Sequence, residues 1–151
     1  MRYLKKFEEL DEWGSLRASE EDIKYHMQVI KDVFQDIFDE YDIEELLDDS
    51  NFGPTGLFYS IFKAGRFNTR LRYNCIYLKI RELDHGSYIR SEAINTMDLS
   101  GHIKRLQNMG YSVSRYDGSF TRYSKHSTKQ KPAKGGGTSN ILIEIGISNL
   151  I

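Results

Sequence analysis

The sequence has little that would support a disulfide, a thiolate metal site or a membrane span. Cys75 is the only cysteine among 151 residues, which excludes an internal disulfide and a zinc site built from several thiolates. Its apolar, strand-like surroundings predict a buried structural thiol rather than a nucleophile. No stretch approaches the roughly 18 consecutive apolar residues of a membrane span, and the N-terminal MRYLKKFEELDEW lacks the apolar core of a signal peptide. These absences predict a cytoplasmic protein that is not anchored in a membrane.

The charge of the chain is divided between its two parts. Residues 1–55 hold 16 acidic and 6 basic side chains, a net charge of −10. Residues 56–151 hold 6 acidic and 15 basic side chains, a net charge of +9, so the whole chain carries only −1. The length is that of one ordinary domain, and we expect residues 1–151 to form a single one.

The clearest helix is expected to begin after Ser19, where SEED supplies an N-cap serine and an acidic residue three positions later. Apolar residues then recur at steps of three and four, which predicts a buried stripe: Ile23, Met27, Ile30, Phe34, Ile37 and Tyr41. The carboxylates on the other side of this helix indicate a solvated surface or a site for a basic partner. They lack EF-hand spacing, and the sequence predicts no metal and no cofactor.

After this helix, the order of apolar and polar residues predicts four strands and a second helix. Residues 57–63 and 71–83 are rich in strand formers and are separated by AGRFNT, which favours a hairpin. Residues 98–110 predict a helix that ends at Gly110. Residues 111–116 and 141–147 then alternate apolar and polar side chains as strands do.

The expected fold is therefore α+β, in the order α-β-β-α-β-β. This order describes two α-β-β units, and it also describes a ferredoxin-like chain whose first strand has been moved to the end. Either description predicts a two-layer sandwich: a mainly antiparallel four-stranded sheet with two helices on one face. The other face of the sheet would be open to solvent or to a partner.

A basic, glycine-rich loop is expected at residues 117–139. No acidic residue occurs from position 118 to 143. Five cations lie in this part of the chain: Arg122, Lys125, Lys129, Lys131 and Lys134. They alternate with aromatic residues, among them Tyr123, and could contact nucleic-acid phosphates or an acidic protein surface, although an unstructured linker has the same composition. The KGGGTS motif leads into a strand rather than a helix, which argues against a phosphate-binding P-loop.

The expected second strand offers a further binding surface. Tyr73, Tyr77, Lys79 and Arg81 would share one face of the sheet, where aromatic rings could stack on bases and cations could contact phosphates. Tyrosine is also a good strand former, so a purely structural role is the alternative.

Two short histidine motifs suggest one enzymatic alternative. HGS at His85 to Ser87 and HST at His126 to Thr128 resemble the paired His-x-Ser/Thr motifs of the two-histidine phosphoesterases. The resemblance implies that His85 and His126 act as acid and base while Ser87 and Thr128 bind phosphate. In that family the motifs lie in apolar strands, whereas here they lie in polar surroundings.

The first ten residues, MRYLKKFEEL, resemble the start of many small uncharacterised proteins of large tailed bacteriophages. The resemblance implies an accessory or virion protein, in the host cytoplasm or the virion, and names no activity. An ordinary amphipathic N-terminal helix would explain the same residues.

From these features we expect a non-catalytic interaction or assembly module whose acidic and basic halves bind a protein partner or another copy of the chain. Nucleic-acid binding through the basic loop and the aromatic sheet face is the first alternative. A phosphodiesterase is the second.

Overall fold

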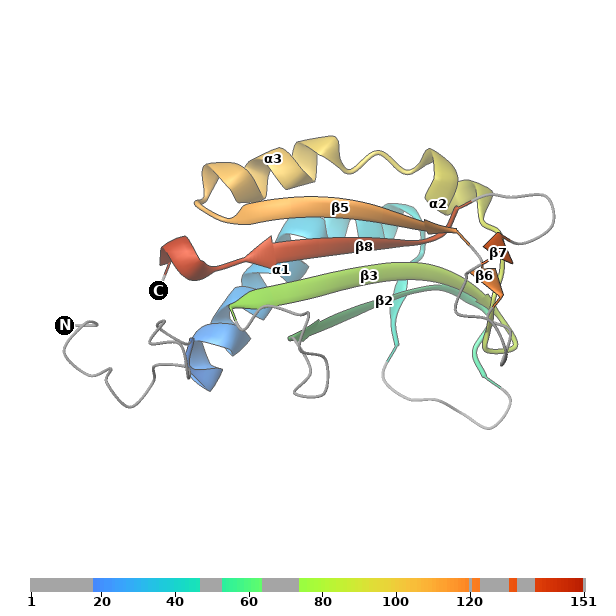
Figure 1. Ribbon diagram of the computed structural model, residues 1–151, viewed down its shortest axis with the longest axis horizontal. Helices are drawn as coiled ribbons and strands as arrows, with labels where there is room; N and C mark the ends of the chain where they lie inside the picture. The colour runs from blue at the N-terminus through green and yellow to red at the C-terminus, as the bar shows by residue number, and fades with distance from the viewer. Residues whose placement is uncertain are drawn as a thin grey trace.

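A computed structural model of the protein describes residues 18–46, 53–63, 74–119, 121–122, 131–132 and 138–150, and Figure 1 shows their arrangement. The helical elements are α1 (Glu20–Glu40), α2 (Glu92–Thr96), α3 (Ser100–Asn108) and the short 3₁₀ turn η3 (Ser148–Leu150). The longer strands are β2 (Gly56–Lys63), β3 (Cys75–Asp84), β5 (Ser112–Ser119) and β8 (Thr138–Gly146). The shorter strands are β1 (Glu44–Glu45), β4 (Ser87–Tyr88), β6 (Thr121–Arg122) and β7 (Lys131–Pro132).

The main sheet has the strand order β1-β2-β3-β8-β5, and β4 pairs with the end of β3. The four long strands pair antiparallel, as the sequence predicts, whereas β1 runs parallel to β2. Because β8 is antiparallel to both β3 and β5, those two strands are parallel to each other, and α2 and α3 form the connection between them. This split β-α-β unit is one component of the ferredoxin-like arrangement.

The prediction of four strands and two helices is correct only in part. In the described residues the main sheet is a mixed sheet of six strands, and three α-helices are present. The additional elements, β1, β4 and α2, have two to five residues each, too few to show a period of 2 or 3.6 in the sequence. A local signal does exist for α2, where the Ser91 hydroxyl accepts a hydrogen bond from the Ile94 amide at 3.0 Å.

Helix α1 begins where its sequence predicts. The Ser19 side chain accepts a hydrogen bond from the Asp22 amide at 3.1 Å, and three acidic residues in the first turn complement the partial positive charge of the helix N-terminus. Its buried side chains are Ile23, His26, Ile30, Val33, Phe34, Ile37 and Phe38. This set contains four of the six predicted stripe residues, while Met27 and Tyr41 are partly buried against the core.

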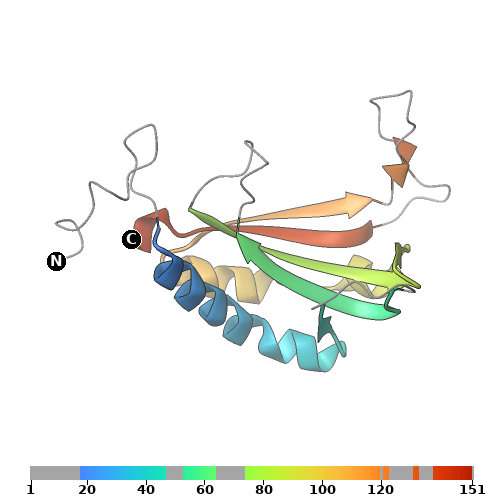
Figure 2. The same cartoon turned by 90° about the horizontal axis from the view of Figure 1, so that it is seen from below.

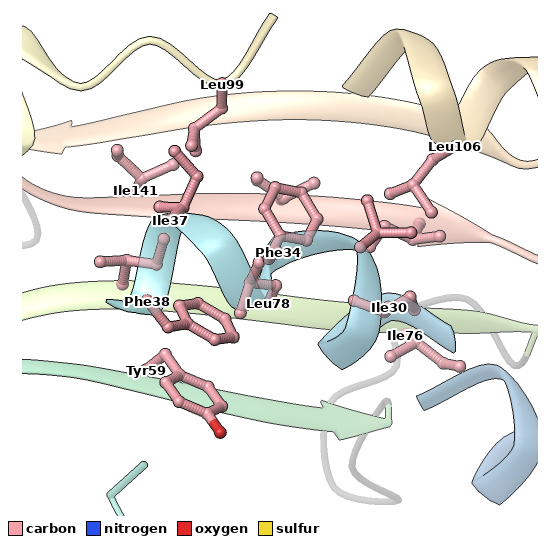
Figure 3. Close-up of a cluster of buried hydrophobic side chains, with 14 of the residues drawn as sticks. Ile30, Phe34, Ile37, Phe38, Tyr59, Ile76, Leu78, Leu99, Leu106 and Ile141 are labelled. Carbon is pink, nitrogen blue, oxygen red and sulfur yellow. The ribbon is translucent and has the colours of Figure 1, made fainter. Parts of the chain in front are cut away.

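The core lies between the helices and one face of the sheet (Figure 3). Phe34 is fully buried, and its ring stacks on Phe38 and on His102 of α3, with centroid separations of 6.4 and 5.5 Å. The Phe38 ring in turn stacks on Tyr59 of β2 at 3.8 Å. Aromatic contacts thus tie α1 both to the neighbouring helix and to the sheet.

The two longer helices are also joined by a polar contact. His102 Nε2 of α3 lies 2.9 Å from Asp36 Oδ1 of α1. This hydrogen bond is the largest cause of the lowered pKa of Asp36; desolvation opposes it, and the charge of His102 and the Ile37 amide add smaller contributions that lower the pKa.

The lowered pKa predicts how this contact depends on pH. A carboxyl group whose pKa is lower in the folded state stabilises the fold above its unfolded pKa of about 3.9, and the stabilisation is lost as the pH falls through the folded pKa. We expect the Asp36 pKa to rise toward its ordinary value in His102→Asn, which a carbon-detected NMR titration would measure. An Asp36 pKa that stays equally low in this variant would contradict the assignment.

Cys75 is buried, as its apolar surroundings predict. None of the helices in the described part of the chain has the length and apolar composition needed to cross a membrane.

Candidate anion-binding face of the sheet

The helices cover only one face of the sheet (Figure 2). Ile76, Leu78 and Ile80 of β3 belong to the core on that side. Because successive side chains of a strand point to opposite faces, Tyr77, Lys79 and Arg81 point to the other side, which we call the open face. The predicted alternation of the apolar residues is confirmed, whereas the expectation that the other side of β3 is exposed to solvent is correct only in part: Cys75, Tyr77 and Leu83 on that side are buried, and Lys79 and Arg81 are partly buried.

The strand register places the open-face residues of the four long strands in rows. In the order β2, β3, β8, β5 these rows are Phe58, Arg81, Asn140 and Gly118; Ser60, Lys79, Leu142 and Tyr116; and Phe62, Tyr77, Glu144 and Ser114. Cations therefore occupy two successive rows on β3, at the centre of the sheet. The third row carries the one carboxylate of this set, Glu144.

A cluster of two cations and a phenol lies on this face. Arg81 Nη1 donates a hydrogen bond to the Tyr88 hydroxyl at 2.8 Å. The Lys79 ammonium lies 5.0 Å from the centre of the Tyr88 ring, and the Arg81 guanidinium carbon lies 5.5 Å from it. We call Lys79, Arg81 and Tyr88 the Tyr88 cluster. All three side chains are partly buried, which strengthens their electrostatic interactions relative to those in water.

The positive charges of Lys79 and Arg81 affect the pKa of the Tyr88 hydroxyl. Desolvation by burial alone would raise the pKa of Tyr88. Hydrogen bonds from Lys79 and Arg81, together with their charges, outweigh that effect, so the pKa of Tyr88 is lowered. The cluster therefore favours negative charge at this point of the sheet.

Within the described residues, neither cation of the cluster has a carboxylate as an ion-pair partner. Glu144, the acidic residue of the neighbouring row, accepts a hydrogen bond from the Tyr77 hydroxyl at 3.2 Å. The Nε atom of Arg81 is buried and has no hydrogen-bond partner. An unsatisfied buried donor is costly, by about 1–3 kcal/mol, and usually has an explanation such as a ligand or a water molecule. The charges of Lys79 and Arg81 are thus not neutralised by any carboxylate of the described residues.

A tight hairpin holds Tyr88 in place. His85 and Gly86 both have positive φ, of 50° and 82°, which is the conformation of the two-residue turn that best matches the twist of paired strands. The Gly86 amide donates a hydrogen bond to the Pro54 carbonyl at 2.9 Å, and the His85 amide donates to the Thr55 hydroxyl at 3.0 Å. The turn directs β4 back along β3, so that Tyr88 pairs with Leu83.

Sequence reasoning found two members of this cluster and missed the third. Lys79 and Arg81 were predicted on the open face, but Tyr88 follows a hairpin whose returning strand has only two residues. The available signal was the glycine of Asp84-His85-Gly86-Ser87, placed directly after a strong strand.

Of the other predicted binding residues, the structure describes only one side chain, that of Tyr77. Tyr77 points to the open face but is only 1% exposed; its ring stacks on Phe62 and its hydroxyl donates a hydrogen bond to Glu144. Arg122 and Lys131 are partners across the β6–β7 pair. Their side chains lie outside the described part of the structure, as do the following residues: Tyr73, Tyr123, Lys125, Lys129 and Lys134.

The histidine motifs are described only in part. His85 and Ser87 are exposed at the β3–β4 turn, and His85 Nε2 lies 3.7 Å from the carboxylate of Asp84. The HGS motif therefore has a structural role as a hairpin turn. His126 and Thr128 lie outside the described residues. No group of three or more metal-ligating side chains occurs among the residues that the structure describes.

Comparison with known proteins finds no relative of this chain. The chain matches no protein-family model, no curated protein and no solved structure. Function has to be inferred from the open face itself.

Proposed function

We propose that the protein binds nucleic acid through the open face of its sheet, with the Tyr88 cluster as a contact for backbone phosphate. The observation that carries this proposal is the pair of partly buried cations, Lys79 and Arg81, that share Tyr88 and have no ion-pair partner among the described residues. A desolvated pair of cations is unfavourable without a counter-ion, and an anion at this point would relieve it.

Phosphate suits this cluster in its chemistry. The planar guanidinium of Arg81 offers several donors in a fixed geometry, and Arg and Lys are the usual partners of phosphate oxygens. Its Nη1 atom is oriented by Tyr88, so less entropy would be lost when it binds.

The position of strands β6 and β7, which belong to the basic, glycine-rich part of the chain, supports a polyanionic ligand. Strands β6 and β7 lie between β5 and β8 in the chain, and Figure 2 shows them on the side of the sheet opposite the helices. Arg122 and Lys131 are paired there. The sequence of this part of the chain is basic, which would suit a ligand with many negative charges such as a nucleic-acid backbone.

Removing the two cations tests the proposal. The double variant Lys79→Gln/Arg81→Gln should lower affinity for an oligonucleotide by at least about 100-fold at low salt, because charge-assisted contacts contribute about 1.5–3 kcal/mol each. The slope of log affinity against log salt should decrease in magnitude by about 0.7 for a single strand, since the two cations share one phosphate and each phosphate contact contributes about 0.7. Fluorescence anisotropy across a salt series would measure both quantities.

The helix layer offers a matched control. Lys104→Gln/Arg105→Gln removes the same charge from exposed positions of α3, and it should change affinity by less than threefold. An equal loss in both double variants would indicate a general charge effect and overturn the proposal. A wild-type protein that binds no oligonucleotide at low salt would do the same.

Self-association through opposite charges is the second candidate. One observation favours it: the outward surface of α1 carries exposed carboxylates in the helix layer, on the side opposite the open face, namely Asp32, Asp36, Asp39 and Glu40. The open face of one copy could contact this surface of another copy and form head-to-tail assemblies.

Light scattering across a salt series would test this second candidate. The mass at low salt should exceed that of the 17.6 kDa monomer and should decrease as salt screens the charges. A strict monomer at low salt would rule out the assembly, whatever the result with nucleic acid.

A further inference from the structure

The open face exposes aromatic rings as well as cations. Four large apolar side chains are exposed in the described part of the chain: Tyr25, Phe62, Met109 and Tyr116. Tyr25 lies on α1 and Met109 at the end of α3, whereas Phe62 and Tyr116 lie on the open face, with 36% and 52% of their surface exposed. Half of this set thus shares a face with the Tyr88 cluster.

The register places these two rings on opposite sides of Lys79. Tyr116 of β5 is in the same row as Lys79, two strands away, which corresponds to about 10 Å. Phe62 of β2 is in the next row, one strand away on the other side, which corresponds to about 8 Å. A chain that crosses the sheet over Lys79 would pass one ring on either side.

The ring of Phe62 is held in place by its neighbour. It stacks on Tyr77 with a centroid separation of 5.6 Å and an angle of 20° between the ring planes. The Tyr77 hydroxyl is fixed by Glu144, and its side chain is almost fully buried. Tyr77 therefore does not present its own ring to a ligand but holds the ring of Phe62 in place. Because the Phe62 ring is already held, it would lose less entropy on binding.

Aromatic rings exposed on a sheet favour single-stranded over double-stranded nucleic acid. An aromatic side chain on an open sheet can stack only on a base whose face is accessible, and in a duplex those faces are covered by the neighbouring base pairs. Each stacked base strengthens binding by about 5- to 150-fold, whatever its identity. A four-stranded sheet with aromatic residues is an established platform for unpaired bases.

We infer that the ligand of the open face is single-stranded nucleic acid, with bases stacked on Phe62 and Tyr116 and a phosphate bound by Lys79 and Arg81. This inference rests on the proposed function and adds the strand form and the two stacking residues. Because stacking tolerates every base, the inference predicts little sequence preference.

Binding to matched probes tests the inference. A labelled single-stranded oligonucleotide should bind at least tenfold more tightly than the same strand annealed to its complement. The double variant Phe62→Leu/Tyr116→Leu should lose at least tenfold in affinity for the single strand and less than threefold for the duplex. Unchanged thermal unfolding of the variant would show that its fold is intact.

Two controls separate stacking from other effects. Tyr25→Leu removes an exposed ring from α1 and should leave binding to either probe unchanged. An abasic strand of equal length keeps the phosphates but offers no bases, so the wild-type protein should bind it about as weakly as the double variant binds the normal strand.

The outcomes distinguish this inference from the function on which it rests. A duplex that binds as tightly as the single strand, with the Phe62/Tyr116 variant unaffected, would overturn the inference and leave nucleic-acid binding in place. A protein that binds neither probe would overturn both. Loss of single-strand binding in the Tyr25→Leu control to the same extent would also overturn the assignment of the two rings.

Discussion

Phe34→Ala is expected to lower the free energy of unfolding by about 3–5 kcal/mol. Phe34 is fully buried, and its ring stacks on both Phe38 and His102. The truncation removes a large apolar side chain and leaves a cavity between α1, α3 and the sheet, where the neighbouring rings cannot collapse fully (Figure 3). Since ordinary domains are stable by about 5–15 kcal/mol, this loss would take much of the total. Urea denaturation followed by circular dichroism would measure it.

The same helix offers a control for Phe34→Ala. Tyr25 is 65% exposed, and Tyr25→Ala should change the free energy of unfolding by less than about 1 kcal/mol. Equal effects of the two substitutions would mean that Phe34 does not occupy the centre of the core.

The importance of Phe34 follows from a pattern that the sequence shows clearly. Helix α1 is 21 residues long, has an N-cap serine and carries an apolar stripe along its length, so its start and its buried face could be predicted. The four long strands were also predictable, because eight or more residues are enough to show alternation. Their antiparallel pairing followed from the order of the elements.

The parts that the sequence did not reveal are short or depend on contacts distant in the chain. Strand β4 has two residues, and its existence depends on a turn whose glycine, Gly86, packs against Gly53 more than 30 positions earlier. Tyr77 likewise stacks on Phe62 of another strand and is almost fully buried. Alternation assigned Tyr77 to the correct face, but it could not show that the side chain would be buried there.

The candidate site illustrates the same limit. Composition and alternation predicted a basic, aromatic face and identified Lys79 and Arg81. The third member, Tyr88, becomes visible only when the hairpin returns it to the side of β3. Pairing across strands also selects Phe62 and Tyr116, because exposure is set by neighbours that are distant in the sequence.

Gly53→Ala is expected to destabilise the protein by about 2–4 kcal/mol and to weaken nucleic-acid binding, although Gly53 is not part of the open face. Gly53 has a φ of 68°, which an alanine adopts at a cost, and an added Cβ would lie 2.4 Å from the Gly86 Cα. The atoms that it meets belong to the backbone of the β3–β4 turn and cannot rotate away. The turn has to move, and Tyr88 would move with it away from Lys79 and Arg81.

A second glycine shows that this effect depends on position. A Cβ added at Gly101 in α3 would meet no atom within 4 Å, and Gly101→Ala should stabilise the protein by about 0.5–1 kcal/mol because alanine is the better helix former. Urea denaturation and oligonucleotide anisotropy, applied to both variants, should therefore give changes of opposite sign in stability and a loss of affinity only for Gly53→Ala. If Gly53→Ala unfolds at the wild-type urea concentration and binds as tightly, the packing of the turn against Gly53 does not position Tyr88. If it is destabilised but binds normally, the turn is important for folding and Tyr88 is not needed for the ligand.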